Sequence, residues 1–134
     1  MAGAMAASLS SMVASLHYSK KDHFDQRELF EEIGKKAQSL KDNLKYLVDE
    51  DTHSFNKIIE SNRLPEKNKH EKEQKIAKKQ DAIKYAIEIP FRTAENCFSI
   101  LEIIKSILPR VNPNSISDLG VSSEIAMSAV RSGC

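Results

Sequence analysis

The amino-acid sequence predicts an all-α protein, an up-and-down bundle of long helices with one helix kinked near Pro90. Only four glycines and four prolines occur in the 134 residues, which does not suit a sandwich with a turn every dozen residues. Apolar residues recur at alternating steps of three and four along two long segments, the pattern of an amphipathic helix. No segment shows the strict alternation of a strand. We therefore expect a single all-helical domain over residues 1–134.

The first predicted helix covers residues 2–16 and is built largely of small side chains, which let helix backbones approach closely. Its surface is apolar on nearly all sides, so we expect it to be central in the bundle. Residues 17–21 form a polar break after it. The small residues are Ala4, Ala6, Ala7, Ser8, Ser10 and Ala14.

The second predicted helix covers about residues 22–61 and carries one continuous apolar stripe. Gly34 costs about 1 kcal/mol relative to alanine but need not break a helix. Pro65 ends the helix, because the residue before a proline is pushed out of the α region. The stripe comprises Phe30, Ile33, Ala37, Leu40, Leu44, Leu47, Val48, Asp51, Phe55 and Ile58.

A third long helix is predicted over about residues 71–108, with Pro90 inside it and Pro109 at its end. A proline inside a helix removes one hydrogen bond and clashes with the preceding turn, so we expect the kink between Ile87 and Pro90. Residues 66–81, which precede the helix and include its first turns, are mostly charged. We interpret them as a solvated loop that leads into an exposed helical turn, or alternatively as a site for the anionic tail of a ligand.

The last predicted helix follows a turn at Asn112, Pro113 and Asn114. Either Ser115 or Ser117 can cap it, because a hydroxyl oxygen there accepts from a free backbone N–H. We expect this helix to run to about residue 131.

The bulk composition excludes several classes of function. The formal net charge is +1, so nothing global attracts the chain to nucleic acid or to an anionic membrane. No apolar stretch approaches the roughly 18 residues that cross a bilayer. The two cysteines, Cys97 and Cys134, favour a reduced cytoplasmic protein, with a disulfide between them as the alternative. The four histidines lack the spacing of metal ligands, so we expect no metal site.

Asp51 is the first candidate for chemistry, because it lies on the apolar stripe of its helix. A carboxylate buried without partners is costly, so something must compensate. Asp49 and Glu50 stand beside it, and clustered carboxylates raise one another's pKa, which can produce a general acid or base near neutral pH. The alternative is that these three side chains are simply solvated.

Asp118 is the second candidate. We expect it in the first turn of the last helix, where the helix dipole favours a negative charge. Val121, Ser122 and Ile125 share its face, which points it toward the interior. The alternative role for Asp118 is a simple N-terminal cap.

Taken in order, several segments resemble the formiminotetrahydrofolate cyclodeaminase / methenyltetrahydrofolate cyclohydrolase family. They are AGAMAASLSSMVASL, LVDEDTHSFNKIIESNRLP, AIEIPFRTAE and NPNSISDLGVSS. The most specific features are Asp-Glu-Asp before Phe55, the Arg-Leu-Pro stop, Pro90 and the segment NPNSISDLG. The resemblance covers nearly the whole chain. It implies a helical enzyme that closes formiminotetrahydrofolate with loss of ammonia, or that hydrolyses methenyltetrahydrofolate.

The resemblance also implies which residues act. Asp118 is then the first candidate for catalysis, followed by Asp51 and Asp49, and Asp51 and Asp118 should converge on one pocket. No cofactor beyond the tetrahydrofolate substrate is implied, and the partners are a folate small molecule and further copies of the chain, at least a dimer. The implied substrate-binding residues are Asn112 and Ser117 for hydrogen bonds and Lys20 and Lys21 for the glutamate tail.

The chain departs from the family pattern at both ends. Family members have a Gly-rich, Ser-containing loop before the small-residue helix and a further helix after the last one, so we expect this chain to be truncated at each end. Two other functions stay open. One is a catalytically incomplete scaffold, and the other is an interaction module that docks through its charged segment, with Lys67, Lys69, Lys72 and Lys75.

Overall fold

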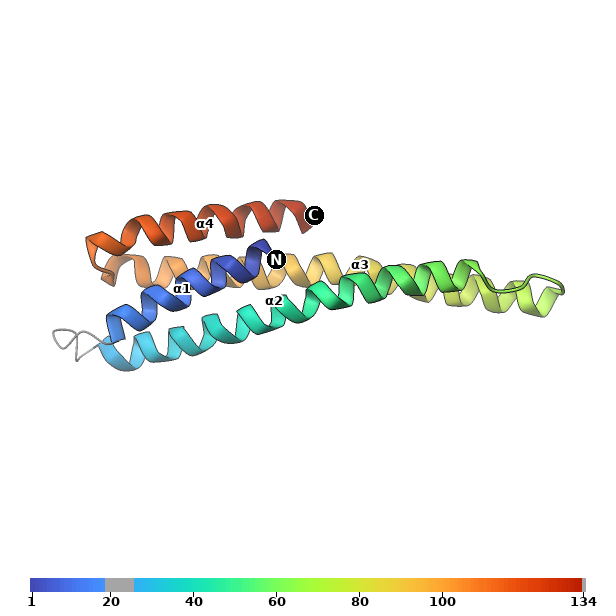
Figure 1. Cartoon of the computed structure of the whole chain (residues 1–134), viewed down its shortest axis with the longest axis horizontal. Helices are drawn as coiled ribbons and strands as arrows, with labels where there is room; N and C mark the ends of the chain where they lie inside the picture. The colour runs from blue at the N-terminus through green and yellow to red at the C-terminus, as the bar shows by residue number, and fades with distance from the viewer. Residues whose placement is uncertain (19–25, 134) are drawn as a thin grey trace.

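The structure, a computed structural model, describes residues 1–18 and 26–133. These residues form four α-helices and one short 3₁₀ helix: α1 (Ala2–Tyr18), α2 (Arg27–Asn62), α3 (Lys69–Ile107), η2 (Leu108–Arg110) and α4 (Pro113–Gly133). Consecutive α-helices run in opposite directions (Figure 1), and the described residues contain no strand. The prediction of an all-α, up-and-down bundle is confirmed.

The helices differ greatly in length, and this difference shapes the molecule. α2 and α3 have 36 and 39 residues, whereas α1 and α4 have 17 and 21. α1 packs against α2 and α4, and α3 packs against the same two helices. In Figure 1, α1 and α4 lie along one half of the long α2–α3 hairpin. The bundle therefore narrows from four helices to two part-way along its length.

α1 packs with its small residues inward and its large residues outward, so the expectation of a central helix buried all round is wrong. Met5 and Met12 are 59% and 45% exposed. The small face allows close approach, because a Cβ on Gly3 would lie 2.4 Å from the Cys97 Sγ of α3. The buried positions of α1 are Gly3, Ala4, Ala6, Ala7, Ser10, Val13, Ala14 and His17.

The seam between α1 and α4 contains buried hydroxyl groups that satisfy one another. Ser122 Oγ donates to the carbonyl oxygen of Ala6 at 2.8 Å, and Ser10 Oγ lies 2.9 Å from Ser122 Oγ. Since a hydroxyl has one proton to donate, Ser10 must donate to Ser122. This chain of two bonds fixes the register of α1 on α4.

His17 ties the end of α1 to the start of α4. Its Nε2 accepts the backbone N–H of Asn112 at 2.6 Å, so Nδ1 carries the proton and donates to the carbonyl of Val13 at 3.0 Å. The ring stacks on Phe30 of α2 with centroids 5.0 Å apart. One buried side chain thereby connects three helices.

The turn between α2 and α3 is shorter than the sequence indicated. α2 ends at Asn62, as Pro65 predicts, but α3 already begins at Lys69. Asn68 Oδ1 accepts the N–H of Glu71, and Glu71 Oε2 accepts the N–H of Lys67, both at 2.8 Å. These two hydrogen bonds at the N-terminal end start the helix early. Most of the charged segment is therefore exposed helix rather than loop.

α3 continues through Pro90 without a break. Because proline has no N–H, the carbonyl of Ala86 loses its helical donor. The kink expected at Pro90 stays a prediction.

α4 begins at Pro113, so the expected caps at Ser115 and Ser117 are wrong. Asn112 precedes the helix, and its Oδ1 accepts the N–H of Asn114 at 3.0 Å. Proline is favoured at the first helical position because its fixed φ suits the helix and its missing N–H needs no partner there. The earlier start leaves the first turn of α4 without an acidic residue, so Asp118 lies in the second turn.

Candidate functional site

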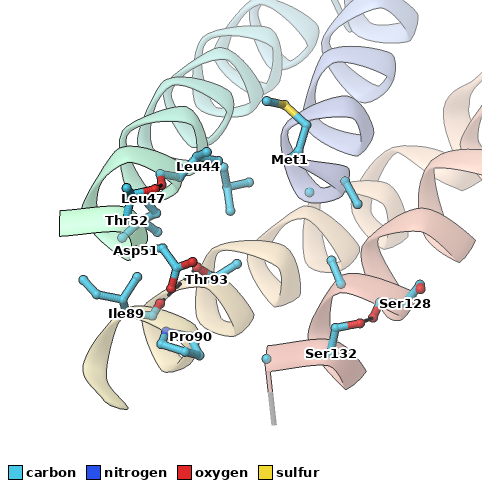
Figure 2. A pocket seen from close by; sticks show the side chains of 15 residues that line it. Met1, Leu44, Leu47, Asp51, Thr52, Ile89, Pro90, Thr93, Ser128 and Ser132 are labelled. Atoms are coloured by element: carbon cyan, nitrogen blue, oxygen red, sulfur yellow. Dashed lines mark hydrogen bonds between the residues drawn. The ribbon is translucent and has the colours of Figure 1, made fainter. Parts of the chain in front are cut away.

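A cavity of about 420 Å³ lies where the bundle narrows from four helices to two. We call it the junction cavity. All four helices contribute to it: the start of α1, the middle of α2 and α3, and the end of α4 (Figure 2). Its lining comprises Met1, Ala2, Gly3, Leu44, Leu47, Val48, Asp51, Thr52, Ile89, Pro90, Thr93, Ser128, Ala129, Ser132 and Gly133.

Asp51 lies in register with the buried residues of α2, but its side chain faces this cavity instead of the core. Leu47 and Ser54, which flank it in the seam, are buried at 3% and 2% exposure, whereas Asp51 is exposed. The alternative of a solvated Asp51 is therefore confirmed, whereas the burial expected for Phe55 on the same stripe is wrong, because Phe55 is 62% exposed. The prediction that Asp51 lies in register with the apolar stripe of α2 is confirmed.

Three hydroxyl groups of the cavity donate their protons to their own helices. Thr93 Oγ1 donates to the carbonyl of Ile89 at 3.0 Å, and Ser132 Oγ donates to the carbonyl of Ser128 at 2.8 Å. Thr52 Oγ1 points in the same way at a carbonyl 3.4 Å away. Their oxygens keep free lone pairs, so toward the cavity these side chains are acceptors.

The end of α4 is held against α3 beside Pro90. A Cβ placed on Gly133 would lie 2.9 Å from the carbonyl oxygen of Pro90 and 3.2 Å from Cβ of Ala94. Only a glycine fits at this distance without a shift. The contact brings Ser128 and Ser132 across from Asp51, as Figure 2 shows.

Asp118 does not share the junction cavity. It is half-buried on α4, and about 15 Å of helix separates it from Ser128, at roughly 1.5 Å per residue. The expected convergence of Asp51 and Asp118 therefore does not occur within one chain. The catalytic role of Asp118 stays a prediction.

The other predicted site residues lie apart from the cavity. Asp49 and Ser117 are exposed, and neither lines it. Asn112 is half-buried, with its Oδ1 occupied in capping α4. Lys20 and Lys21 lie outside the described residues. Their predicted roles are untested.

Sequence reasoning missed the hydroxyl-bearing wall formed by Thr93 and Ser132. A signal was present, because Thr93 stands three residues after Pro90, about one turn along the same face of a helix. Ser132 had no such signal, since its place follows from where α4 ends against α3.

No cluster of three or more metal-ligating side chains occurs in residues 1–18 and 26–133. Within the same two ranges, no helix has the length and apolarity to cross a membrane.

The fold and the site define an all-helical bundle with one carboxylate facing an open cavity at its four-to-two-helix junction. The chain belongs to the formiminotransferase-cyclodeaminase family, whose model matches residues 1–134. The resemblance seen in the sequence is thereby confirmed.

Individual relatives agree with this assignment. The chain is 29% identical over 132 residues to a methenyltetrahydrofolate cyclohydrolase of Methylorubrum extorquens, covering 98% of this chain and 64% of that protein. It is 25% identical over 129 residues to a formimidoyltransferase-cyclodeaminase of Gallus gallus, covering 96% of this chain and 24% of that protein. The chain thus spans less than two thirds of each of these relatives.

A solved structure has the same fold. A formiminotetrahydrofolate cyclodeaminase from Thermotoga maritima superposes with a TM-score of 0.83 at 21% identity, over 98% of this chain and 62% of that one. At this identity the match supports the fold of the chain.

Proposed function

We propose that this chain is a folate one-carbon enzyme domain that holds the reacting carbon of a tetrahydrofolate derivative in the junction cavity. The reaction is either closure of formiminotetrahydrofolate with release of ammonia or hydrolysis of methenyltetrahydrofolate. The observation that carries the proposal is the family match over residues 1–134, together with a single cavity that presents Asp51. The relatives named for these two activities support it.

The chemistry suits a carboxylate. Both reactions pass through a tetrahedral carbon bonded to two folate nitrogens. Closure needs an acid that protonates the amino nitrogen as it leaves the carbon as ammonia. Hydrolysis needs a base that takes a proton from water. Asp51 can serve either direction by holding or giving up one proton. We propose that no cofactor beyond the folate substrate takes part.

We also propose that the chain works as a homo-oligomer in the cytoplasm. Large apolar side chains are exposed on all four α-helices, among them Met5 and Met12 on α1 and Phe91 and Phe98 on α3, and such surfaces favour association. A second copy would offer Asp118 a route to the junction cavity of the first. Cys97 is a buried free thiol, which suits a reducing compartment. Light scattering tests the association, and a monomer at micromolar concentration would contradict it.

Activity is tested by following methenyltetrahydrofolate optically while the chain converts it, or forms it from formiminotetrahydrofolate. General acid–base catalysis contributes about 10²–10⁴-fold, so Asp51→Asn should lower kcat/KM by about that factor. Asp42→Asn is the matched control, because Asp42 is exposed on the same helix and does not line the cavity. A wild-type chain that neither converts nor binds a folate would refute the proposal and favour the scaffold function.

A further inference from the structure

We propose that Thr93 acts together with Asp51 and that the two side chains hold the attacking or leaving group of the proposed reaction. They form a pair of hydrogen-bond acceptors on facing helices, and the group between them is a water molecule or an amino group. This inference rests on the proposed function, since it concerns the same cavity and the same chemistry. It goes further, because it assigns a second residue and a bound water to the reaction.

Asp51 and Thr93 lie on facing walls of the junction cavity. Asp51 belongs to α2 and Thr93 to α3, and these two helices pack against each other. Figure 2 shows both side chains pointing into the space between the two helices. Both residues stand well inside their helices, so their placement follows from the pairing of α2 with α3.

The hydroxyl of Thr93 has a fixed orientation. Its proton is donated to the carbonyl oxygen of Ile89 at 3.0 Å. A threonine in a helix has two favoured χ1 rotamers, and this hydrogen bond selects one of them. The side chain is half-buried and stands one turn after the buried Ile89. Oγ1 of Thr93 therefore presents lone pairs, and no proton, to the cavity.

The other hydroxyl groups of the cavity are held less firmly. Thr52 is exposed, and its Oγ1 lies 3.4 Å from the nearest helical carbonyl oxygen. Ser128 and Ser132 are exposed, and a serine lacks the second branch that restricts χ1 in threonine. Thr93 is therefore the neutral acceptor that the structure orients best.

The pair of acceptors suits the hydrolysis direction. A water molecule that donates one proton to the Asp51 carboxylate and the other to Thr93 Oγ1 directs a lone pair away from both, toward the carbon of the ligand. The new C–O bond forms, the electron pair of the attacked C=N bond moves to nitrogen, and Asp51 takes the first proton. The second proton stays on oxygen, hydrogen-bonded to Thr93. Such positioning lowers the barrier by removing the search for a reactive geometry.

The same pair suits the closure direction. The amino group of the tetrahedral intermediate then occupies the place of the water, with one N–H donated to Thr93 Oγ1. A protonated Asp51 gives its proton to the lone pair of this nitrogen. The C–N bond breaks with its electron pair on nitrogen, ammonia leaves, and Asp51 is left as the carboxylate.

Thr93→Val tests the pair, because valine has nearly the same shape and lacks the acceptor. The fold should not suffer, because the carbonyl of Ile89 keeps its helical donor, the backbone N–H of position 93. We expect kcat to fall about tenfold, which corresponds to about 1.4 kcal/mol, with KM little changed. Thr93→Ser should keep most of the rate, and both variants should keep the urea midpoint of the wild-type chain.

Ser99→Ala is the matched control. Ser99 also lies on α3 and donates its proton to a carbonyl one turn earlier, that of Glu95 at 3.2 Å. It does not line the junction cavity. The control therefore removes the same kind of hydrogen bond from the same helix and should leave kcat unchanged. An equal loss in Ser99→Ala and Thr93→Val would overturn the inference.

A double-mutant cycle tests whether Asp51 and Thr93 act on the same group. In Asp51→Asn the base is gone, so adding Thr93→Val should lower kcat by less than about twofold more, since effects within one unit do not add. Losses that multiply, a wild-type kcat in Thr93→Val, or no recovery in Thr93→Ser overturns the inference and leaves the folate function standing. A wild-type chain that converts neither folate overturns the proposed function, and the inference with it.

Discussion

Replacing His17 by phenylalanine tests whether the junction of α1 and α4 depends on a hydrogen bond rather than on packing. The ring of His17 is 1% exposed and stacks on Phe30 with centroids 5.0 Å apart, and a phenyl ring can keep that stacking. What His17→Phe removes is the acceptor for the N–H of Asn112, which lies 2.6 Å from Nε2, together with the bond from Nδ1–H to the Val13 carbonyl. A buried donor left without a partner costs about 1–3 kcal/mol.

We therefore expect His17→Phe to lower the free energy of unfolding by about 2 kcal/mol. For a chain of this size that corresponds to a drop of roughly 6–10 °C in Tm. Urea unfolding followed by far-UV circular dichroism measures it, with His17→Ala as the comparison that also loses the stacking, worth about 0.5–1.5 kcal/mol. If His17→Phe unfolds within about 0.5 kcal/mol of wild type while His17→Ala is much weaker, packing alone holds the junction and the reasoning fails.

Substitutions at four further residues test local geometry. Gly34→Ala should raise stability by about 1 kcal/mol, because alanine is the better helix former and its Cβ would meet only a methyl group of α1 at 3.8 Å. Gly3→Ala should lower stability by about 1–3 kcal/mol, because its Cβ would lie 2.4 Å from a buried sulfur. A urea midpoint that falls for Gly34→Ala or rises for Gly3→Ala would contradict the corresponding prediction. Asn112→Ala should cost about 1 kcal/mol through loss of the cap, and Asn112→Asp should not, as thermal melts will show. The hydrogen bond from Lys75, and after it the charge of Lys75, lowers the pKa of Glu66. The pair therefore stabilises the fold at pH values above the ordinary glutamate pKa. This stabilisation is lost as the pH falls through the lowered pKa. Glu66→Gln should therefore flatten the acidic side of a stability–pH curve, and an unchanged curve would exclude the pair as a cause.

The sequence predicted the helices well because their causes are local. Pro65 excludes the α region just before it, and the three–four spacing of apolar residues indicates which face of α2 is buried. The errors lie at the starts of helices, where one hydrogen bond decides. Asn68 accepts the N–H of Glu71 and Glu71 accepts the N–H of Lys67 at the start of α3, and Asn112 caps α4 ahead of the serines that seemed better placed.

The candidate site was less predictable, because it depends on where helices end relative to one another. Asp51 was correctly placed in the register of the buried face of α2, but its side chain is exposed and lines the junction cavity. The family resemblance implied that Asp118 approaches Asp51. No local pattern in the sequence gives the distance between two such residues along the bundle axis, and here about 15 Å of α4, at roughly 1.5 Å per residue, separates Asp118 from Ser128 in the junction cavity.

The position of Asp51 is itself an argument for function. The buried face of α2 includes Leu44, Leu47, Ser54 and Ser61, and Asp51 stands in the same register but lines the junction cavity. Were the cavity only a gap, an apolar residue would stabilise the α2–α3 hairpin more, since leucine is also the better helix former. A charged residue in this register breaks a local rule, and such exceptions are expected at functional sites. The carboxylate is exposed to the cavity, where it can remain charged and contact a ligand, while Leu47 and Ser54 beside it stay buried.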